Sequence, residues 1–390
     1  MKNNQLLDTP EKIRSFQIEF IEWYEKEKRN LPWRINLDPY RIWISEIMLQ
    51  QTRVDTVIDY YYRFMEWFPT IKALAEASDE RLLKAWEGLG YYSRARNLKA
   101  AAQQIISDFE GEMPKSIEEI RELKGIGPYT AGAIGSIAFG LPEPAIDGNV
   151  MRVVSRLFEI EADIAKASSR KLFDEAMRLI IDEQRPGDFN QAMMDLGSAI
   201  CTPTSPKCEA CPIQSYCAGY ANGTMTSYPV KSKKMKPKDV YYIGTIIENK
   251  KQEYLVEQRS DKGLLANMWL FPIKEVTKKE FEAMQRDWAE VNQQLALDID
   301  QESLVAEESS SQLLNSYDQV VWQKRSLGEV THIFSHLKWH ILVFYGRGTE
   351  NHPLEPQQEW LSAERFSEYV FPKPQQKMVE LLKKEFSSKK

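Results

Sequence analysis

The sequence predicts a multidomain protein in which an all-α domain is followed by an α/β domain. A chain of 390 residues is long enough for two domains with separate cores. Apolar residues recur at helical spacing in 14–28, whereas the runs 240–248 and 337–345 are typical of strands. The segment between the two patterns is poor in apolar residues, and its lysines are Lys231, Lys233, Lys234, Lys236 and Lys238. We therefore expect a helical domain over 1–220, a basic linker over 221–239 and a second domain over 240–390.

The charge and hydropathy of the chain restrict its function. A net charge of −6 argues against general electrostatic attraction of nucleic acid by the whole protein. Binding to DNA would therefore need a local binding site. No apolar run is long enough to cross a membrane, and residues 1–10 are polar. We expect a cytoplasmic protein that has no membrane partner.

Residues 116–139 contain the clearest local pattern of the helical domain. Ser116 and Glu119 form a capping box that begins one helix. Gly125 and Gly127 then allow a tight turn, and Pro128 suits the first turn of a second helix. Free amides at the start of that helix could bind a DNA phosphate without a basic side chain. Two nearby glycines also fit an ordinary helical corner, and that alternative remains open.

Two carboxylates are candidates for acid–base chemistry. Asp147 precedes a helical run and has the position of a helix cap, where amide donors favour the ionised form. Glu46 is the single acid of an apolar run, whose burial would raise its pKa, although it could also lie on a solvated helix face. Residues 1–220 contain no histidine, so acid chemistry there must use carboxylates. A protonated acid and a carboxylate are what cleavage of a glycosidic bond needs.

The cysteines of the chain lie in one short stretch, at Cys201, Cys208, Cys211 and Cys217. Four thiolates so close in sequence can bind tetrahedral zinc or an iron–sulfur cluster. The single close pair fits zinc less well, because a zinc site of four cysteines usually has two such pairs. Disulfides are the alternative that a reducing cytosol disfavours.

Five motifs resemble, in order, those of adenine DNA glycosylases of the MutY family, within the endonuclease III and helix-hairpin-helix glycosylase superfamily. They are SEIMLQQT at 45–52, GLGYYSRARNL at 88–98, LKGIGPYTAGAI at 123–134, AIDGNV at 145–150 and the cysteine spacing. The resemblance covers nearly the whole helical domain. It implies that the four cysteines hold a [4Fe-4S] cluster.

The resemblance also implies catalytic roles. Glu46 would protonate the extruded adenine, Asp147 would stabilise the sugar cation, and Asn149 would help to position the reacting groups. Tyr129 stands where bifunctional relatives carry a lysine that forms a Schiff base, so a monofunctional enzyme is implied, and Tyr129 would assist near the leaving base. A buried structural tyrosine is the alternative interpretation of this residue.

Further residues are implied to contact DNA. Arg34 would line the adenine pocket, while Gln51, Leu89 and Tyr91 would fill the space beside the lesion. Gly125 and Gly127 would hold a phosphate. Plain helix packing is the alternative for the tyrosine pair at 91 and 92. The family usually has proline at the position of Lys124, so this sequence departs from the family pattern within the hairpin.

The second domain resembles a Nudix-like fold around Leu264–Pro272. It lacks the glutamate-rich helix that binds Mg²⁺ in a working Nudix hydrolase, because 273–310 shows no such array. Phe334, Ser335 and His336 match the loop by which the family recognises 8-oxoguanine, although a strand-end turn is the plainer interpretation. Asn267 stands where glycine is expected.

The predicted protein is a base-excision repair enzyme that hydrolyses adenine from mispairs with 8-oxoguanine or guanine in double-stranded DNA and leaves an abasic site. It is expected to act as a monomer near the nucleoid. Two alternatives are a bifunctional glycosylase and lyase, and a noncatalytic iron–sulfur protein that binds damaged DNA.

Overall fold

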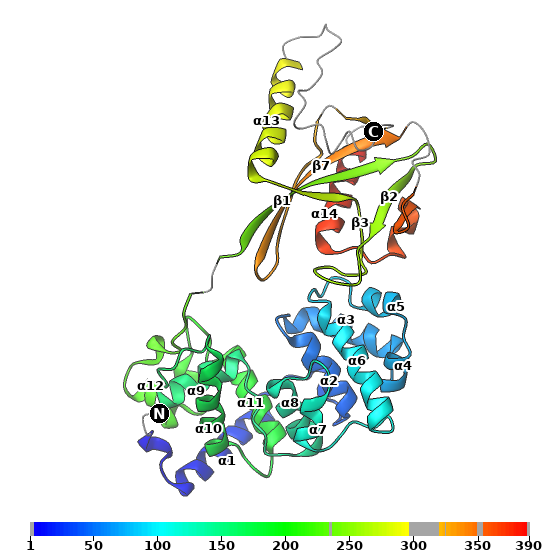
Figure 1. Ribbon diagram of the computed structural model, residues 1–390. Coiled ribbons are helices and arrows are strands. Elements are labelled where there is room, and N and C mark those ends of the chain that lie inside the picture. Colours follow the sequence, from blue (N-terminus) through cyan, green and yellow to red (C-terminus); the bar gives the residue numbers. More distant parts are fainter. Residues whose placement is uncertain (1–3, 234–235, 296–319, 324, 349–353, 388–390) are drawn as a thin grey trace. The chain divides into compact units, whose positions relative to one another are not determined.

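The computed structural model describes residues 4–233, 236–295, 320–323, 325–348 and 354–387, and it divides the chain into two compact units. The helical unit comprises residues 1–85 and 91–233, and the sheet unit comprises 86–90 and 234–390 (Figure 1). Residues 234 and 235 of the predicted linker lie outside the described residues, and the predicted domain boundaries stay predictions. None of the described helices is long and apolar enough to span a membrane.

The helical unit contains twelve α-helices in its described residues. They are α1 (Pro10–Glu27), α2 (Pro39–Leu49), α3 (Val54–Trp67), α4 (Ile71–Ala75), α5 (Asp79–Ala85), α6 (Ser93–Asp108), α7 (Ile117–Glu122), α8 (Pro128–Phe139), α9 (Gly148–Phe158), α10 (Arg170–Ile180), α11 (Pro186–Ala199) and α12 (Ala218–Ala221). Helix α11 packs against α1, α8 and α9, and α2 packs against α3 and α8. The predicted all-α domain is confirmed.

The core of the helical unit is built from apolar helix faces. Phe16 and Phe20 of α1 pack on Phe189 of α11, with ring centroids 6.0 and 5.5 Å apart. Apolar side chains of α9 and α10 complete this cluster. Burial of such large side chains contributes roughly 1.5–3 kcal/mol each. This core therefore fixes the positions of α9 and α11, which carry site residues at their ends.

Helices α7 and α8 form the predicted hairpin. Ser116 caps α7 by accepting from the amide of Glu119 at 3.3 Å. Gly125 has φ of 78°, and a Cβ there would lie 2.6 Å from Asn97, so only glycine fits this turn. Gly127, the N-cap of α8, has open space at its Cβ position. The amide of Lys124 donates to Gln104 Oε1 at 3.1 Å, a bond that proline could not make.

Gly132 brings α8 against the segment that leads to Asp147. A Cβ at Gly132 would lie 2.2 Å from the carbonyl oxygen of Pro144. Asn190 of α11 holds the same segment, because its Oδ1 accepts from the amide of Ala145 at 3.0 Å. The backbone that precedes Asp147 is thus held by two helices.

The sheet unit contains eight strands in its described residues, and two helices lie on it. They are β1 (Lys238–Glu248), β2 (Glu253–Gln258), β3 (Trp269–Leu270), β4 (Ile273–Val276), β5 (Val320–Trp322), β6 (Gly328–Ile333), β7 (Leu337–Gly348), β8 (Gln358–Ser362), α13 (Lys278–Leu295) and α14 (Lys373–Ser387). The main path is β3-β2-β1-β7-β5, with β4 on β1, β6 on β7 and β8 on β2. Strands β1 and β7 are parallel, and the other pairs are antiparallel.

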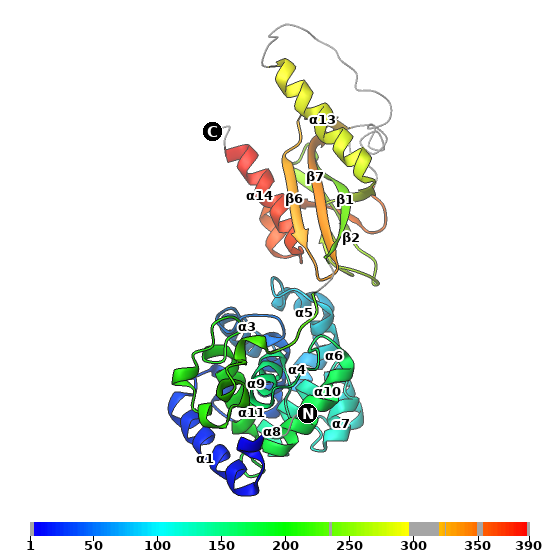
Figure 2. The ribbon, with the colours of Figure 1, turned by 90° about the vertical axis from the view of Figure 1, so that its left-hand side faces the viewer.

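The alternation of side chains along the central strands buries both faces of the sheet. Ile243 and Leu342 pack with Phe281 of α13 on one face. A Cβ at Gly244, the next residue of β1, would lie 2.9 Å from Met378 of α14, which covers the other face. Figure 2 shows the two helices on opposite sides of the sheet. The predicted α/β domain is confirmed.

Two details of the sheet unit bear on the sequence predictions. Asn267 has φ of 56°, in the left-handed region that favours glycine and that asparagine tolerates. The departure from the expected glycine therefore keeps the same backbone conformation. The stretch 273–310, whose sequence shows no Nudix glutamate array, is described only as far as residue 295.

Candidate active site and iron–sulfur site

A cavity of about 170 Å³ in the helical unit brings five of the predicted site residues together. Its lining comes from α2, α8, α9, α11, the segment before α2 and the start of α3. The predicted residues among the lining are Arg34, Glu46, Tyr129, Asp147 and Asn149. Residues from 34 to 149 in the sequence thus meet in one pocket.

Glu46 lies on α2 and is 6% exposed, so it is not on a solvated helix face. The Tyr129 hydroxyl donates to Glu46 Oε2. Burial raises the pKa of Glu46 to about 7, and Asp147 adds to the rise, while the Tyr129 hydrogen bond and the charge of Arg34 oppose it. Glu46 can therefore hold a proton near neutral pH and release it to a bound base.

Asp147 is the N-cap of α9. Its Oδ1 accepts from the amide of Val150 at 2.7 Å, and its Oδ2 accepts from Asn149 Nδ2 at 2.9 Å. These donors lower the pKa of Asp147, but burial raises it by more, so the net direction is upward. The amide donors favour the ionised form as expected, but the net direction is set by burial, because the carboxylate is enclosed by the pocket as well as capped.

Asp195 is a site residue that the sequence predictions missed. It lies on α11 and is buried, and it accepts from Arg34 at 2.7 Å and from Arg29 Nε at 3.0 Å. The guanidinium group of Arg34 also lies over the ring of Tyr24, at 5.7 Å from the ring centroid. Like Glu46, Asp195 is a single acid in an apolar stretch, a signal that could have found it.

The residues predicted to fill the space beside a lesion lie at two turns. Gln51 follows α2 with φ of 60°, and Tyr91 precedes α6 with φ of 48° and is 45% exposed. Leu89, in contrast, is buried at 7% exposed. Arg94 of α6, a second missed residue, donates to the carbonyls of Ile47, Met48 and Gln50 at 2.7, 3.3 and 2.8 Å and lies over the Tyr91 ring. One guanidinium therefore holds both turns.

Phe334, Ser335 and His336 form the turn between β6 and β7 in the sheet unit. The amide of Phe334 donates to the carbonyl of Leu337 at 2.7 Å, which closes the turn. Ser335 and His336 are exposed, whereas the Phe334 ring is half-buried against Trp339, at a centroid distance of 4.9 Å. The turn therefore exposes the polar side chains of Ser335 and His336, and it packs the Phe334 ring against Trp339.

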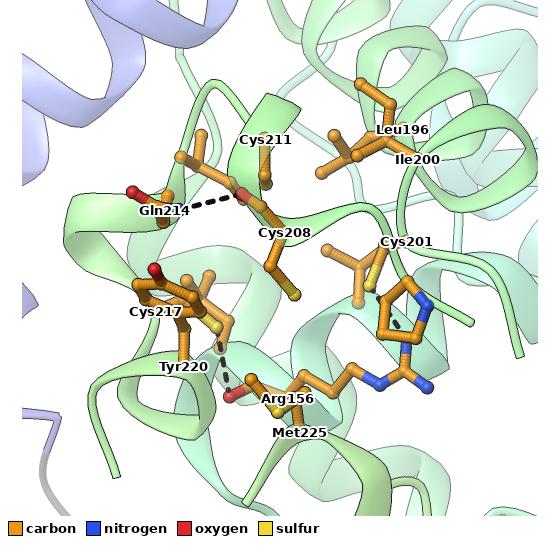
Figure 3. A pocket seen from close by; sticks show the side chains of 14 residues that line it. Arg156, Leu196, Ile200, Cys201, Cys208, Cys211, Gln214, Cys217, Tyr220 and Met225 are labelled. Carbon is orange, nitrogen blue, oxygen red and sulfur yellow. Dashed lines mark hydrogen bonds between the residues drawn. The ribbon is translucent and has the colours of Figure 1, made fainter. Parts of the chain in front are cut away.

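The four cysteines line one cavity with an apolar wall (Figure 3). All four are free, and Arg156 donates to Cys201 Sγ at 3.2 Å. Burial raises the pKa of the Cys211 thiol to about 12 and that of Cys217 to about 11, so a metal must replace these protons.

The lining of the cysteine cavity bears on the metal group that it could hold. A [4Fe-4S] cluster is held by four cysteine thiolates. The apolar wall and the absence of a carboxylate from the lining fit the cluster.

Family models match three parts of the chain. A model described as HhH-GPD superfamily base excision DNA repair protein matches residues 44–178. A NUDIX domain model matches 243–381, and a model described as the iron-sulfur binding domain of endonuclease III matches 201–217. The last match, together with the cavity of four cysteines, identifies the site as an iron–sulfur site.

Relatives with similar sequences cover most of the chain. The adenine DNA glycosylase of Rattus norvegicus is 34% identical over 94% of this chain and 79% of the relative. That of Homo sapiens is 34% identical over 91% and 71%. Among solved structures, a thermostable thymine-DNA glycosylase is 30% identical with a TM-score of 0.50, over 54% of this chain and 98% of that one.

Proposed function

The chain belongs to the adenine DNA glycosylase family, and we propose that it removes adenine paired with 8-oxoguanine or guanine and leaves an abasic site. It is a base-excision repair glycosylase with an iron–sulfur site and a Nudix-like second domain. The observation that carries the proposal is the pairing of Glu46 and Asp147 in one cavity with different surroundings. We place its action on nucleoid DNA, as a monomer.

Glu46 supplies the proton for the leaving base. With a pKa raised to about 7, it is substantially protonated at neutral pH and can donate this proton to a bound base. Its proton goes to N7 of the extruded adenine. The electrons of the N-glycosidic bond then move to the base, which leaves as neutral adenine.

Asp147 supplies the negative charge under the sugar. Bond cleavage leaves an oxocarbenium-like sugar, and a carboxylate on one side stabilises that cation. The amide of Val150 and the side chain of Asn149 hold the carboxylate in place. Water adds to the anomeric carbon, and its released proton returns to Glu46.

Tyr129 supports a monofunctional enzyme. A tyrosine hydroxyl has no amine with which to form a Schiff base, and this one already donates to Glu46. Burial also raises the pKa of Tyr129, so the hydroxyl stays a donor. The same hydroxyl holds the carboxyl group of Glu46 in one orientation.

The β6–β7 turn is the proposed reader of the base opposite adenine. Exposed Ser335 and His336 can address the donor and acceptor groups by which 8-oxoguanine differs from guanine. Phe334 can pack on the base from its braced position.

The four cysteines would hold a [4Fe-4S] cluster that cross-links the end of the helical unit. Arg152 connects this region to the active site, because it donates to the carbonyl of Cys201 at 2.8 Å and to Asn149 Oδ1 at 2.9 Å. The cysteine region therefore stabilises the position of the catalytic helix α9.

A single-turnover assay tests the proposal. The holoprotein should release adenine from a duplex with an adenine:8-oxoguanine pair. Glu46→Gln should lose about a hundredfold or more in rate, because general acid catalysis contributes about 10²–10⁴-fold. Borohydride should trap no covalent adduct. Intact adenine with wild-type protein would refute the activity, full activity of Glu46→Gln would refute the assigned acid, and a trapped adduct would favour the bifunctional alternative.

A further inference from the structure

A second cavity of the helical unit has a volume of about 290 Å³ and a basic lining. The catalytic roles proposed above do not use these basic residues. The cavity lies between α7, α8, α10 and the segment before Asp147. Its cations are Arg121, Arg170, Lys171 and Arg178, and its one acid is Asp174. We call it the basic groove.

The charges of the basic groove are only partly neutralised. Arg178 pairs with Asp174 and Glu143 at 2.8 Å each, and Arg121 pairs with Glu143 at 3.4 Å. Arg170 and Lys171 are exposed, and neither has an ion pair among the described residues. Four cations against two carboxylates leave the groove positive on a chain whose net charge is −6. A positive groove on an acidic protein needs an anionic occupant to explain it.

Backbone donors add to this positive potential. Helix α8 begins at the groove with Pro128 and Tyr129, and no side chain caps its first turn. Helix α10 begins there with Arg170, and its N-cap Ser169 makes no capping bond, since the hydroxyl donates to the carbonyl of Asp163 at 2.7 Å. Helix α8 therefore directs uncapped amides to the region that the cations line, whereas the amide of Arg170 in α10 donates to the carbonyl of Ala167. Both helices direct the positive ends of their dipoles there.

The basic groove adjoins the reacting centre. Tyr129 lines both the groove and the catalytic cavity. Pro144 and Ile146 of the groove wall belong to the segment that ends at Asp147. An anionic polymer in this groove would thus pass directly beside the sugar on which Asp147 acts.

We propose that the basic groove holds the backbone phosphates that flank the extruded nucleotide, with Arg170 and Lys171 as the contacts supplied by α10. The inference rests on the proposed function only in that DNA is the substrate. The contacts are to phosphate and so carry no base specificity. They would position the strand so that its sugar meets Asp147.

The test is the salt dependence of DNA binding by the holoprotein with Arg170→Gln and Lys171→Gln together. Loss of two phosphate contacts should make the slope of log K against log salt concentration shallower by about 1.8 and weaken binding by up to about sixtyfold at 0.1 M salt. The change should be the same for a duplex with an adenine:8-oxoguanine pair and for a fully paired duplex.

The matched control removes the same charge elsewhere. Lys26→Gln with Lys72→Gln neutralises two exposed lysines that line none of the cavities described above, and it should leave the slope as in the wild type. An unchanged slope in the α10 variant, or an equal change in the control, would overturn the proposal. Retained cluster absorbance and thermal midpoint show that the variant is folded. Failure to excise adenine would refute the proposed activity and leave this binding comparison intact.

Discussion

The hydrogen bond from Tyr129 to Glu46 should set the pH range of excision. The acid works only when protonated, so with a pKa of about 7 the single-turnover rate should be highest below pH 7 and fall above it. The hydrogen bond stabilises the ionised carboxylate and therefore lowers this pKa. Tyr129→Phe removes the donor, so the descending limb should move to higher pH.

The size of the move follows from the energy of the bond. A hydrogen bond to a charged group contributes about 1.5–3 kcal/mol, and 1.36 kcal/mol corresponds to one pKa unit, so a shift of about one unit or more is expected. At pH 8, a group of pKa about 7 is about one-tenth protonated, and one of pKa about 8 is half protonated. The rate of Tyr129→Phe at pH 8, relative to its own plateau, should thus be about fivefold higher than in wild type.

Rates from pH 5.5 to 9 under single-turnover conditions measure this shift directly, because product release does not contribute. Normalising each profile to its plateau separates the pKa effect from any loss of orientation. Tyr40→Phe is the matched control, since its buried hydroxyl donates to the carbonyl of Phe68 at 2.7 Å and it is not among the residues that line the catalytic cavity. A limb that stays in place in Tyr129→Phe, or that moves to lower pH, would refute the assigned effect of the bond.

Three further predictions concern stability and positioning. Glu46→Gln should raise the thermal midpoint clearly at pH 8 but only a little at pH 5. The folded-state pKa of Glu46, about 7, lies above the usual 4.5. The wild-type protein therefore loses up to about 3 kcal/mol of stability as the pH rises from 4.5 through 7, and the glutamine variant does not. Asp195→Asn should slow excision about tenfold with unchanged duplex affinity, because Arg34 loses its charged partner in the pocket, and a rate equal to wild type would contradict this. Arg94→Lys should weaken lesion binding more than binding to a fully paired duplex, since one ammonium cannot replace the guanidinium under the turns of Gln51 and Tyr91; equal losses on both duplexes would show that these turns do not read the lesion.

The elements that the sequence predicts well are those with local causes. The caps of α7 and α9 and the start of α8 at Pro128 depend on residues within one turn of each other. Glu46 was found because an acid within an apolar run is conspicuous. In each case the pattern contains both the residue and the reason for its position.

The features of the site that could not be predicted depend on contacts between residues that are far apart in the sequence. Arg34 and Asp195 are 161 positions apart, and Arg94 meets carbonyls 44 to 47 positions away. The pKa of Asp147 shows the same limit, because its amide donors are two and three residues away, whereas its burial comes from α2, α8 and α11 closing the pocket. The local sequence therefore predicts the cap and its amide donors, but it does not predict the burial that raises the pKa of Asp147.

Asp147 also shows why the iron–sulfur site can lie far from the chemistry and still matter to it. Helix α9 begins at Asp147, and Arg152 in the next turn binds both Asn149 and the carbonyl of Cys201. Arg156, one turn further, donates to the sulfur of the same cysteine. Loss of the cluster would disturb the contacts of both arginines with Cys201, while the cap at the start of α9 would keep its own hydrogen bonds. Damage at the cysteines should therefore reduce activity through the position of the helix, with the acid Glu46 on α2 left in place.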